Sequence, residues 1–148
     1  SPNHPKSRGE ITLNSSDPYD YPKILFNYLK EEEDLKQTRE CIHVARKILS
    51  QPALAEHAGD EVGPGFDAQS DDELNEYIRS KADTAYHPCG TCKMGVDDMA
   101  VVDQDLKVNG IGNLRVIDAS VIPEIPSANL NAPTLMIAEK GSEAILNN

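Results

Sequence analysis

The side chains best suited to chemistry are gathered in residues 85–95, which read AYHPCGTCKMG. This stretch holds one histidine, two cysteines, two glycines and one lysine. His87 is the leading candidate, because an imidazole has an unperturbed pKa of about 6.5 and can accept a proton near neutral pH. A lone histidine is more often structural than catalytic, so its role has to be argued from the rest of the chain.

Cys89 and Cys92 form a C-x-x-C pair, which allows two other interpretations. A thioredoxin-like dithiol lies where a strand runs into a helix, whereas a predicted helix precedes this pair and a loop follows it. A structural zinc needs about four nitrogen or sulfur ligands, and the two cysteines with His87 supply three. We therefore predict packed thiols and no metal site, and a non-enzymatic zinc or dithiol module is the alternative.

The balance of acidic and basic residues indicates which kinds of binding partner are favoured. Acidic side chains outnumber basic ones by 25 to 14, which gives a formal net charge of -11. That charge disfavours nucleic acid and anionic membrane surfaces as partners, whereas it would attract a cationic substrate. The apolar runs are far shorter than the roughly 20 residues of a membrane span, so we predict none. Three cysteines without a secretory signal indicate reduced thiols and an intracellular location, either cytoplasmic or peripheral to a membrane.

The length of 148 residues suits one domain with its own core, or part of a larger one. The chain begins with Ser1 and Pro2 rather than an initiator methionine. From this start we predict a fragment or a processed product.

The first half of the chain predicts an α+β fold, a mostly antiparallel sheet with packed helices. Period-two alternation at the end of residues 6–14 predicts a half-buried strand, and residues 23–28 predict its partner across a long loop. Apolar residues at helical spacing predict a helix over residues 31–51, with acidic residues at its start and Pro52 as its stop.

A second helix is predicted over residues 71–82, because Ser70 and Glu73 have the spacing of a capping box. This helix leads directly to His87.

The second half of the chain predicts short strands at residues 101–103 and 106–108 and a compact apolar strand at residues 114–118. That last strand ends in Asp118, which the small residue Ala119 follows. A carboxylate beside a small side chain lets a ligand or another backbone approach closely. A buried strand with a turn after it is the alternative interpretation.

A final helix is predicted to begin at Ala132, with Asn131 as its N-cap and Pro133 in its first turn. The free backbone N–H groups at such a helix start carry a partial positive charge. They lie beside the amides of Asn129 and Asn131, so the helix start would suit an anionic oxygen or a polarised ring.

Three strings occur in one order, HPCGTCKMG at residues 87–95, NLRVIDASVIP at 113–123 and NLNAPTLMIAEK at 129–140. They resemble the C-terminal signatures of the glucose-methanol-choline (GMC) oxidoreductases, most closely those of its choline-oxidising members. Residues 7–9, 24–28 and 51–54 also resemble that family. The resemblance therefore covers nearly the whole chain.

The resemblance implies an FAD enzyme that moves hydride from the carbinol carbon of an alcohol to the flavin. His87 matches the family's active-site histidine, which acts on the substrate hydroxyl. Asn129 matches a second position that hydrogen-bonds the same oxygen. Choline, oxidised to betaine aldehyde, is the implied substrate, and another primary alcohol, aryl or aliphatic, is the alternative. The electron acceptor, oxygen or a quinone, stays open.

The resemblance also implies which residues face the cofactor. Asp118 and Ala119 match a stretch that lies against FAD, and Asn131 and Thr134 match the stretch under the flavin ring. The helix start beside these two residues would stabilise negative charge on the ring.

A G-x-G-x-x-G fingerprint for the FAD diphosphate is absent from the sequence. In the family this fingerprint lies at the N-terminus, so the resemblance implies a C-terminal part whose partner is the N-terminal FAD-binding part of the same enzyme. Residues 1–110 would belong to the substrate domain. Residues 111–148 would form a strand and a helix that return to the FAD domain, and this piece alone is expected to be inactive.

Overall fold

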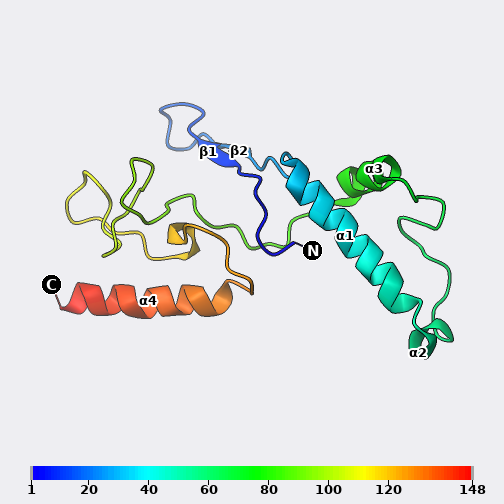
Figure 1. The fold of residues 1–148 in the computed structure, drawn as a ribbon. Coiled ribbons are helices and arrows are strands. Elements are labelled where there is room, and N and C mark those ends of the chain that lie inside the picture. The colour runs from blue at the N-terminus through cyan, green and yellow to red at the C-terminus, as the bar shows by residue number, and fades with distance from the viewer. Residues whose placement is uncertain (1, 148) are drawn as a thin grey trace. The chain divides into compact units, whose positions relative to one another are not determined.

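A computed structural model describes residues 2–147 as two compact units. The first unit comprises residues 2–9 and Lys23–Asp83, and the second comprises Glu10–Pro22 and residues 84–147. Helices and a small antiparallel sheet make up the regular structure, which confirms the α+β class (Figure 1). Among residues 2–147, no helix combines the length and apolar character needed to cross a bilayer.

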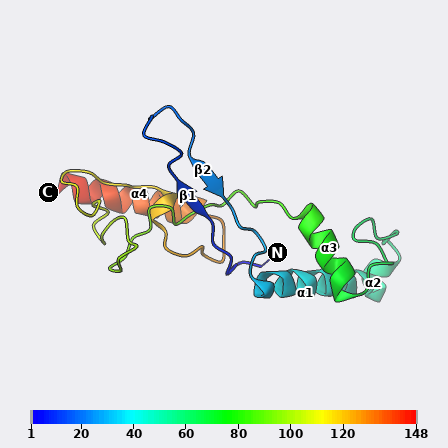
Figure 2. The same ribbon diagram turned by 90° about the horizontal axis from the view of Figure 1, so that it is seen from above.

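Strands β1 (Glu10–Thr12) and β2 (Lys23–Leu25) pair in a two-stranded sheet (Figure 2). A long loop joins them, as predicted from the turn formers in the sequence. Both strands are shorter than predicted, and the buried face predicted for the first strand is wrong, because Ile11 is 50% exposed and Leu13 is 85% exposed. A two-stranded ribbon has no second layer of its own on which to bury one face.

The first unit is built on α1 (Glu32–Leu49), which packs against α3 (Asp71–Lys81). The buried side chains of this contact include Leu35 on α1 and Leu74 on α3. The capping box is present in full, because the Ser70 side chain accepts the backbone N–H of Glu73 and the Glu73 carboxylate accepts that of Ser70. Both helix predictions are confirmed within two residues at each end.

Two details of α1 differ from the prediction. The helix ends at Leu49, and Pro52 begins a short further helix, α2 (Pro52–Ala55). Proline suits a first helical position, where its missing N–H would have had no partner. The C-terminal part of the apolar stripe is exposed, with Val44 and Ile48 more than half accessible. Helical periodicity identifies an apolar face, but packing decides how much of it is covered.

Asp34 anchors the start of the first unit to α1. The residue is 3% exposed, and its carboxylate accepts hydrogen bonds from the backbone N–H groups of Lys6 at 2.7 Å and Ser7 at 2.8 Å and from the Ser7 hydroxyl. Burial raises the pKa of the Asp34 carboxyl, but these hydrogen bonds together lower the pKa below its ordinary value of 3.8. The sequence predicts Asp34 only as part of an acidic helix start.

The second unit contains η1 (Ala119–Val121) and α4 (Asn131–Leu146), and most of its other described residues are irregular. Its hydrophobic core consists of Val102, Leu106, Val121, Ile122, Leu130 and Ile137. The strands predicted at 101–103, 106–108 and 114–118 are wrong. Isolated bridges join Met94 to Val102, Val102 to Val108, and Lys107 to Arg115. A strand needs a continuous hydrogen-bonded neighbour, and single bridges do not make a ladder.

Helix α4 begins one residue earlier than predicted. Leu130 is its N-cap, so Asn131 is the first helical residue and provides no side-chain cap. Pro133 lies in the first turn, as predicted. Gly141 is buried, and a Cβ atom there would lie 2.5 Å from the Ile117 side chain. The missing side chain therefore lets α4 pack closely against the segment that leads to Asp118.

Replacing Asp34 by alanine is expected to destabilise the protein by about 1–3 kcal/mol, because two part-buried backbone N–H groups and the Ser7 hydroxyl lose their acceptor. The exposed α1 residue Glu40 provides a matched control as Glu40→Ala. Denaturant unfolding of the two variants and the wild-type protein measures the difference. Equal stability losses in both variants would contradict the anchoring role.

The stability that Asp34 provides is expected to depend on pH. Because its folded-state pKa lies below the unfolded value, this stability is present above pH 3.8 and is lost as the pH falls through the folded-state pKa. The Asp34→Ala variant should therefore lose less stability than the wild-type protein as the pH falls from about 5. Unfolding curves at several pH values measure this, and parallel pH profiles would argue against it.

Candidate active site

Residues 87–95 are attached to the segment around η1 by backbone hydrogen bonds. The N–H of Cys92 donates to the carbonyl of Ser120 at 3.0 Å, and the N–H of Met94 donates to that of Val121 at 2.8 Å. Gly90 has φ of +88°, a conformation that side chains rarely adopt. The candidate histidine segment and the Asp118–Ala119 segment, which are 31 positions apart in the sequence from His87 to Asp118, therefore belong to one local structure.

His87 is half-buried, and its side chain makes no hydrogen bond within residues 2–147. Tyr86 before it has φ of +59°, which is unusual for a residue other than glycine. Pro88 after it keeps His87 out of the helical conformation. The imidazole is thus held between two constrained neighbours, with its ring nitrogens available to other groups.

The three cysteines differ in what their thiols contact. Cys41, Cys89 and Cys92 are half-buried thiols rather than disulfide partners. Cys89 packs against the hydrophobic core of the second unit. Across the described residues, no group of three or more His, Cys, Asp or Glu side chains is arranged to hold a metal ion. Cys89 therefore takes part in packing, whereas a packing role for Cys92 stays a prediction.

Asp118 caps the start of η1. Its Oδ1 atom accepts the backbone N–H of Ser120 at 2.7 Å, and the Ser120 hydroxyl donates to the same oxygen. The residue is exposed, and Oδ2 accepts no hydrogen bond from the described residues. One carboxylate oxygen therefore stabilises the turn, while the other can accept a hydrogen bond from a hydroxyl of a bound group.

The first turn of α4 carries the partial positive charge of a helix N-terminus, and no acidic side chain of that turn compensates it. It contains no acidic residue and no side-chain cap, whereas α1 and α3 each begin with three acidic residues. Asn129 and Asn131 beside it are exposed. The Thr134 hydroxyl donates to the Leu130 carbonyl at 2.7 Å, so it stabilises the helix start itself. This donor set fits a polarised ring or an anionic oxygen.

The predicted site residues are only partly joined by direct contacts. Residues 92–94 bond directly to 120 and 121, and α4 contacts η1 through the shared core. Asn129 makes no hydrogen bond to His87 within the described chain. The backbone thus gathers the three candidate segments, and the two catalytic candidates keep side chains that are not engaged with each other.

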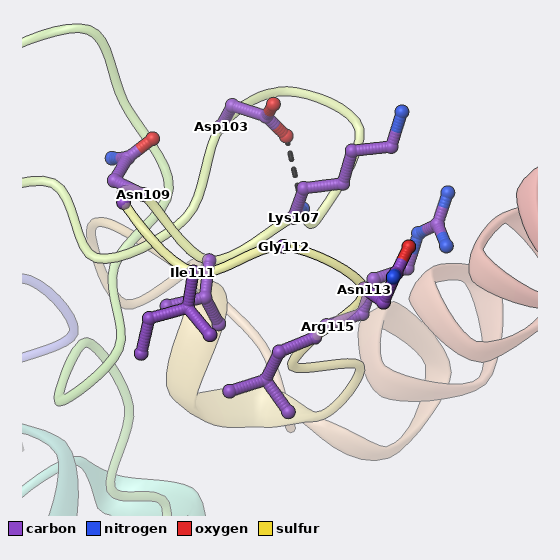
Figure 3. A pocket seen from close by; sticks show the side chains of 10 residues that line it. Asp103, Lys107, Asn109, Ile111, Gly112, Asn113 and Arg115 are labelled. Carbon is purple, nitrogen blue, oxygen red and sulfur yellow. Dashed lines mark hydrogen bonds between the residues drawn. The ribbon is translucent and has the colours of Figure 1, made fainter.

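A depression of about 590 Å³ lies elsewhere in the second unit, on the loop formed by residues 103–115. Figure 3 shows this loop, with the backbone N–H of Lys107 donating to Asp103 at 2.9 Å. None of the predicted site residues lines it. Polar and glycine residues form most of the lining, unlike the apolar walls of typical small-molecule sites. The depression by itself therefore does not identify the active site.

Residues 5–138 match the model of the GMC oxidoreductase family. The chain belongs to that family. It is 52% identical over 139 residues to an oxygen-dependent choline dehydrogenase of Klebsiella pneumoniae subsp. pneumoniae, and 50% identical over 139 residues to one of Escherichia coli O45:K1. Both alignments cover 94% of this chain and 25% of the relative, so the chain spans about a quarter of the length of these curated relatives.

The chain also resembles solved structures of other oxidoreductases. Pyridoxine 4-oxidase from Mesorbium loti superposes with a TM-score of 0.90 at 33% identity, over 99% of this chain and 28% of that one. A fungal aryl-alcohol oxidase superposes with a TM-score of 0.88 at 34% identity, over 98% of this chain and 24% of that one. The irregular backbone of the second unit is therefore a family feature.

Gly90→Ala is expected to cost about 1–3 kcal/mol of stability, because alanine at φ of +88° is strained. The added Cβ atom would also lie 3.4 Å from the Ile122 carbonyl oxygen. Gly112→Ala is a matched control, because nothing lies within 4 Å of a Cβ atom there. Denaturant unfolding measures the free energy of unfolding of both variants. Similar losses in the two variants would contradict the requirement for glycine at position 90.

Proposed function

We propose that this chain is the C-terminal catalytic portion of an FAD-dependent alcohol dehydrogenase that oxidises choline to betaine aldehyde. The observation that carries the proposal is the direct backbone attachment of the His87 segment to the Asp118–Ala119 segment, at Cys92–Ser120 and Met94–Val121. The relatives named oxygen-dependent choline dehydrogenase support the substrate. The net charge of -11 would also favour a cationic alcohol.

His87 is the proposed base. Its half-buried imidazole accepts the hydroxyl proton of the substrate, which makes loss of hydride from the carbinol carbon easier. Asn129 donates a hydrogen bond from its amide to the same oxygen and so stabilises the developing alkoxide. FAD, when bound, would supply the hydride acceptor, so both electrons of the C–H bond would leave the carbinol carbon with the hydrogen while the hydroxyl proton goes to His87.

Four residues of the chain are proposed to contact FAD or to shape its binding site. The Asp118 Oδ2 atom, which accepts no hydrogen bond from the described residues, would accept one from a hydroxyl group of FAD. The small side chain of Ala119 would let FAD approach the backbone closely. Asn131 presents its amide beside the uncapped start of α4. Thr134 acts through the helix start that its hydroxyl stabilises.

The remaining parts of the proposal concern the whole enzyme. Residues 1–110 would serve the substrate domain, and residues 111–148 would return to an FAD-binding domain that the upstream part of the enzyme supplies. The enzyme would work inside the cell, in the cytoplasm or peripheral to a membrane. A different primary alcohol is the second candidate substrate, which the likeness to an aryl-alcohol oxidase favours.

In the full-length, FAD-loaded enzyme, His87→Ala is expected to lower turnover of choline by at least about a hundredfold, the usual scale for a general base. The double variant Cys89→Ser with Cys92→Ser is the control and should keep most of the activity. Turnover per bound flavin, measured with choline and with an aryl alcohol, tests both the residue and the substrate. Near-normal turnover without His87 would exclude the proposed role, and faster turnover of the aryl alcohol would favour the second substrate.

A further inference from the structure

We propose that the depression on residues 103–115 is a docking surface for the upstream part of the enzyme, where an aspartate or glutamate side chain of that part binds Lys107 and Arg115. None of the residues proposed for catalysis or FAD binding lines this depression. The inference rests on the proposed function in one respect, because it takes the chain to be the C-terminal portion of a longer enzyme.

Lys107 and Arg115 lie beside each other in the wall of the depression. They are paired in an isolated antiparallel bridge, and both line the depression (Figure 3). Residues paired in this way point to the same face, with their Cβ atoms about 5 Å apart. Two positive charges in such a pair repel each other, so the pair is stabilised by an anion that binds both.

The Arg115 guanidinium has almost no partner of its own. Its Nε atom donates to the Asp105 carbonyl at 3.4 Å, which is long for a hydrogen bond. Its Nη2 atom is buried and has no hydrogen-bond partner among the described residues. Neither Arg115 nor Lys107 forms an ion pair with a carboxylate of residues 2–147. A buried donor without an acceptor is costly, so this guanidinium calls for an acceptor from outside the described chain.

The other arginines that are not exposed do have carboxylate partners. Arg39 pairs with two carboxylates, both at 3.4 Å, and Arg46 pairs with Glu61 at 3.0 Å. The sequence holds 25 acidic and 14 basic residues, so carboxylates are not scarce. Arg115 is therefore an exception among the half-buried and buried arginines of the described chain.

The one acidic residue in the lining has another role. The Asp103 Oδ1 atom accepts the backbone N–H groups of Asp105 and Lys107, each at 2.9 Å, and so stabilises the turn between them. With two positive side chains and one negative side chain, the lining carries a net positive charge. A positive surface on a chain of net charge -11 favours an anionic partner.

The rest of the lining suits a protein segment better than a single ion. The aliphatic side chains of Ile111 and Leu114 are 57% and 47% exposed. At Gly110 and Gly112 nothing lies within 4 Å of an added Cβ atom, so another backbone has room to approach. A volume of about 590 Å³ matches sites for molecules much larger than an inorganic ion. Exposed aliphatic residues around an arginine are typical of protein interfaces.

The upstream part of the enzyme is the occupant that the lengths favour. This chain spans 25% of the curated relatives, so most of a protein of that length lies outside it. A carboxylate can accept two parallel hydrogen bonds from one guanidinium. One acidic side chain of the upstream part would therefore satisfy the Arg115 Nη2 atom and also compensate the charge of Lys107.

The test is cross-linking of the full-length, FAD-loaded enzyme with a water-soluble carbodiimide, followed by proteolysis and peptide mass spectrometry. The reagent joins an amine to a carboxylate that it contacts through an amide bond, with net loss of one water. We expect Lys107 to be joined to an aspartate or glutamate of the upstream part. Lys93 is the internal control, because its Nζ atom lies 2.8 Å from the Asp97 carboxylate and this pair should couple in the same sample.

Three outcomes of the cross-linking would overturn the docking surface. The first is a Lys93–Asp97 link in a sample where Lys107 has no link. The second is a link from Lys107 to Asp103 or Asp105, because an acid of the same loop would then be its partner. The third is a link to a second copy of the enzyme, which appears as a heavy–light peptide pair when isotope-labelled and unlabelled enzymes are mixed.

Thermal unfolding of the full-length enzyme tests a free anion as the occupant. Inorganic phosphate, added at constant ionic strength, should change the Tm of the wild-type enzyme by less than about 1 °C, because the upstream carboxylate already fills the site. A larger rise in Tm that Arg115→Gln abolishes would overturn the proposal in favour of a free oxyanion. If Arg115→Gln does not fold, Lys107→Gln, at an exposed residue, provides the same comparison.

These outcomes are distinguishable from failure of the proposed function. Lys107→Gln should keep most of the choline turnover, because Lys107 is not proposed to contact the substrate or FAD. A Lys107 link to the upstream part, together with near-normal turnover in His87→Ala, would reject the role of His87 and leave the docking surface in place. A missing link, together with an inactive His87→Ala enzyme, would overturn the docking surface alone.

Discussion

Two backbone hydrogen bonds, from Cys92 to Ser120 and from Met94 to Val121, are the constraint on which the second unit depends. This unit has little regular secondary structure, so its irregular segments must satisfy their backbone groups through specific long-range pairs. These two bonds do so between the histidine segment and the segment that follows Asp118. Burial of Val121 and Ile122 in the core beneath them keeps the pairing in place. The candidate site is therefore organised by its backbone, and its polar side chains remain available for ligands.

The two units use electrostatics in opposite ways. Helices α1 and α3 begin with acidic residues that compensate the positive ends of their own dipoles, and buried Asp34 goes further by binding the preceding segment. Helix α4 begins without such compensation. In an acidic protein, a helix start that lacks carboxylates is a local exception. That exception is consistent with a cofactor whose ring becomes more negative during the reaction, as the proposed function requires.

The helices of the first unit were predictable from the residue pattern. The capping box of Ser70 and Glu73 and the two helices of the first unit follow from propensity and periodicity. The resemblance in residues 87–95 and 129–140 also led to the family that the comparisons establish. The strand at 114–118 was wrong because an apolar run does not reveal whether a hydrogen-bonded neighbour will lie beside it. The N-cap of α4 was misplaced by one residue, because Asn131 suits that position but the chain turns at Leu130.

The sequence by itself led to the family, because three strings in one order resemble its C-terminal signatures, and that resemblance implies the roles proposed for His87, Asn129 and Asp118. It also determined the helices, whose hydrogen bonds are local. Only the tertiary structure decided that Cys89 packs against the core, that Asp34 is buried, and that Tyr86 adopts a left-handed backbone conformation. These outcomes depend on contacts between residues distant in the sequence or on an unusual backbone angle. Neither leaves a periodic signal in the sequence, because burial and strain are properties of the folded chain.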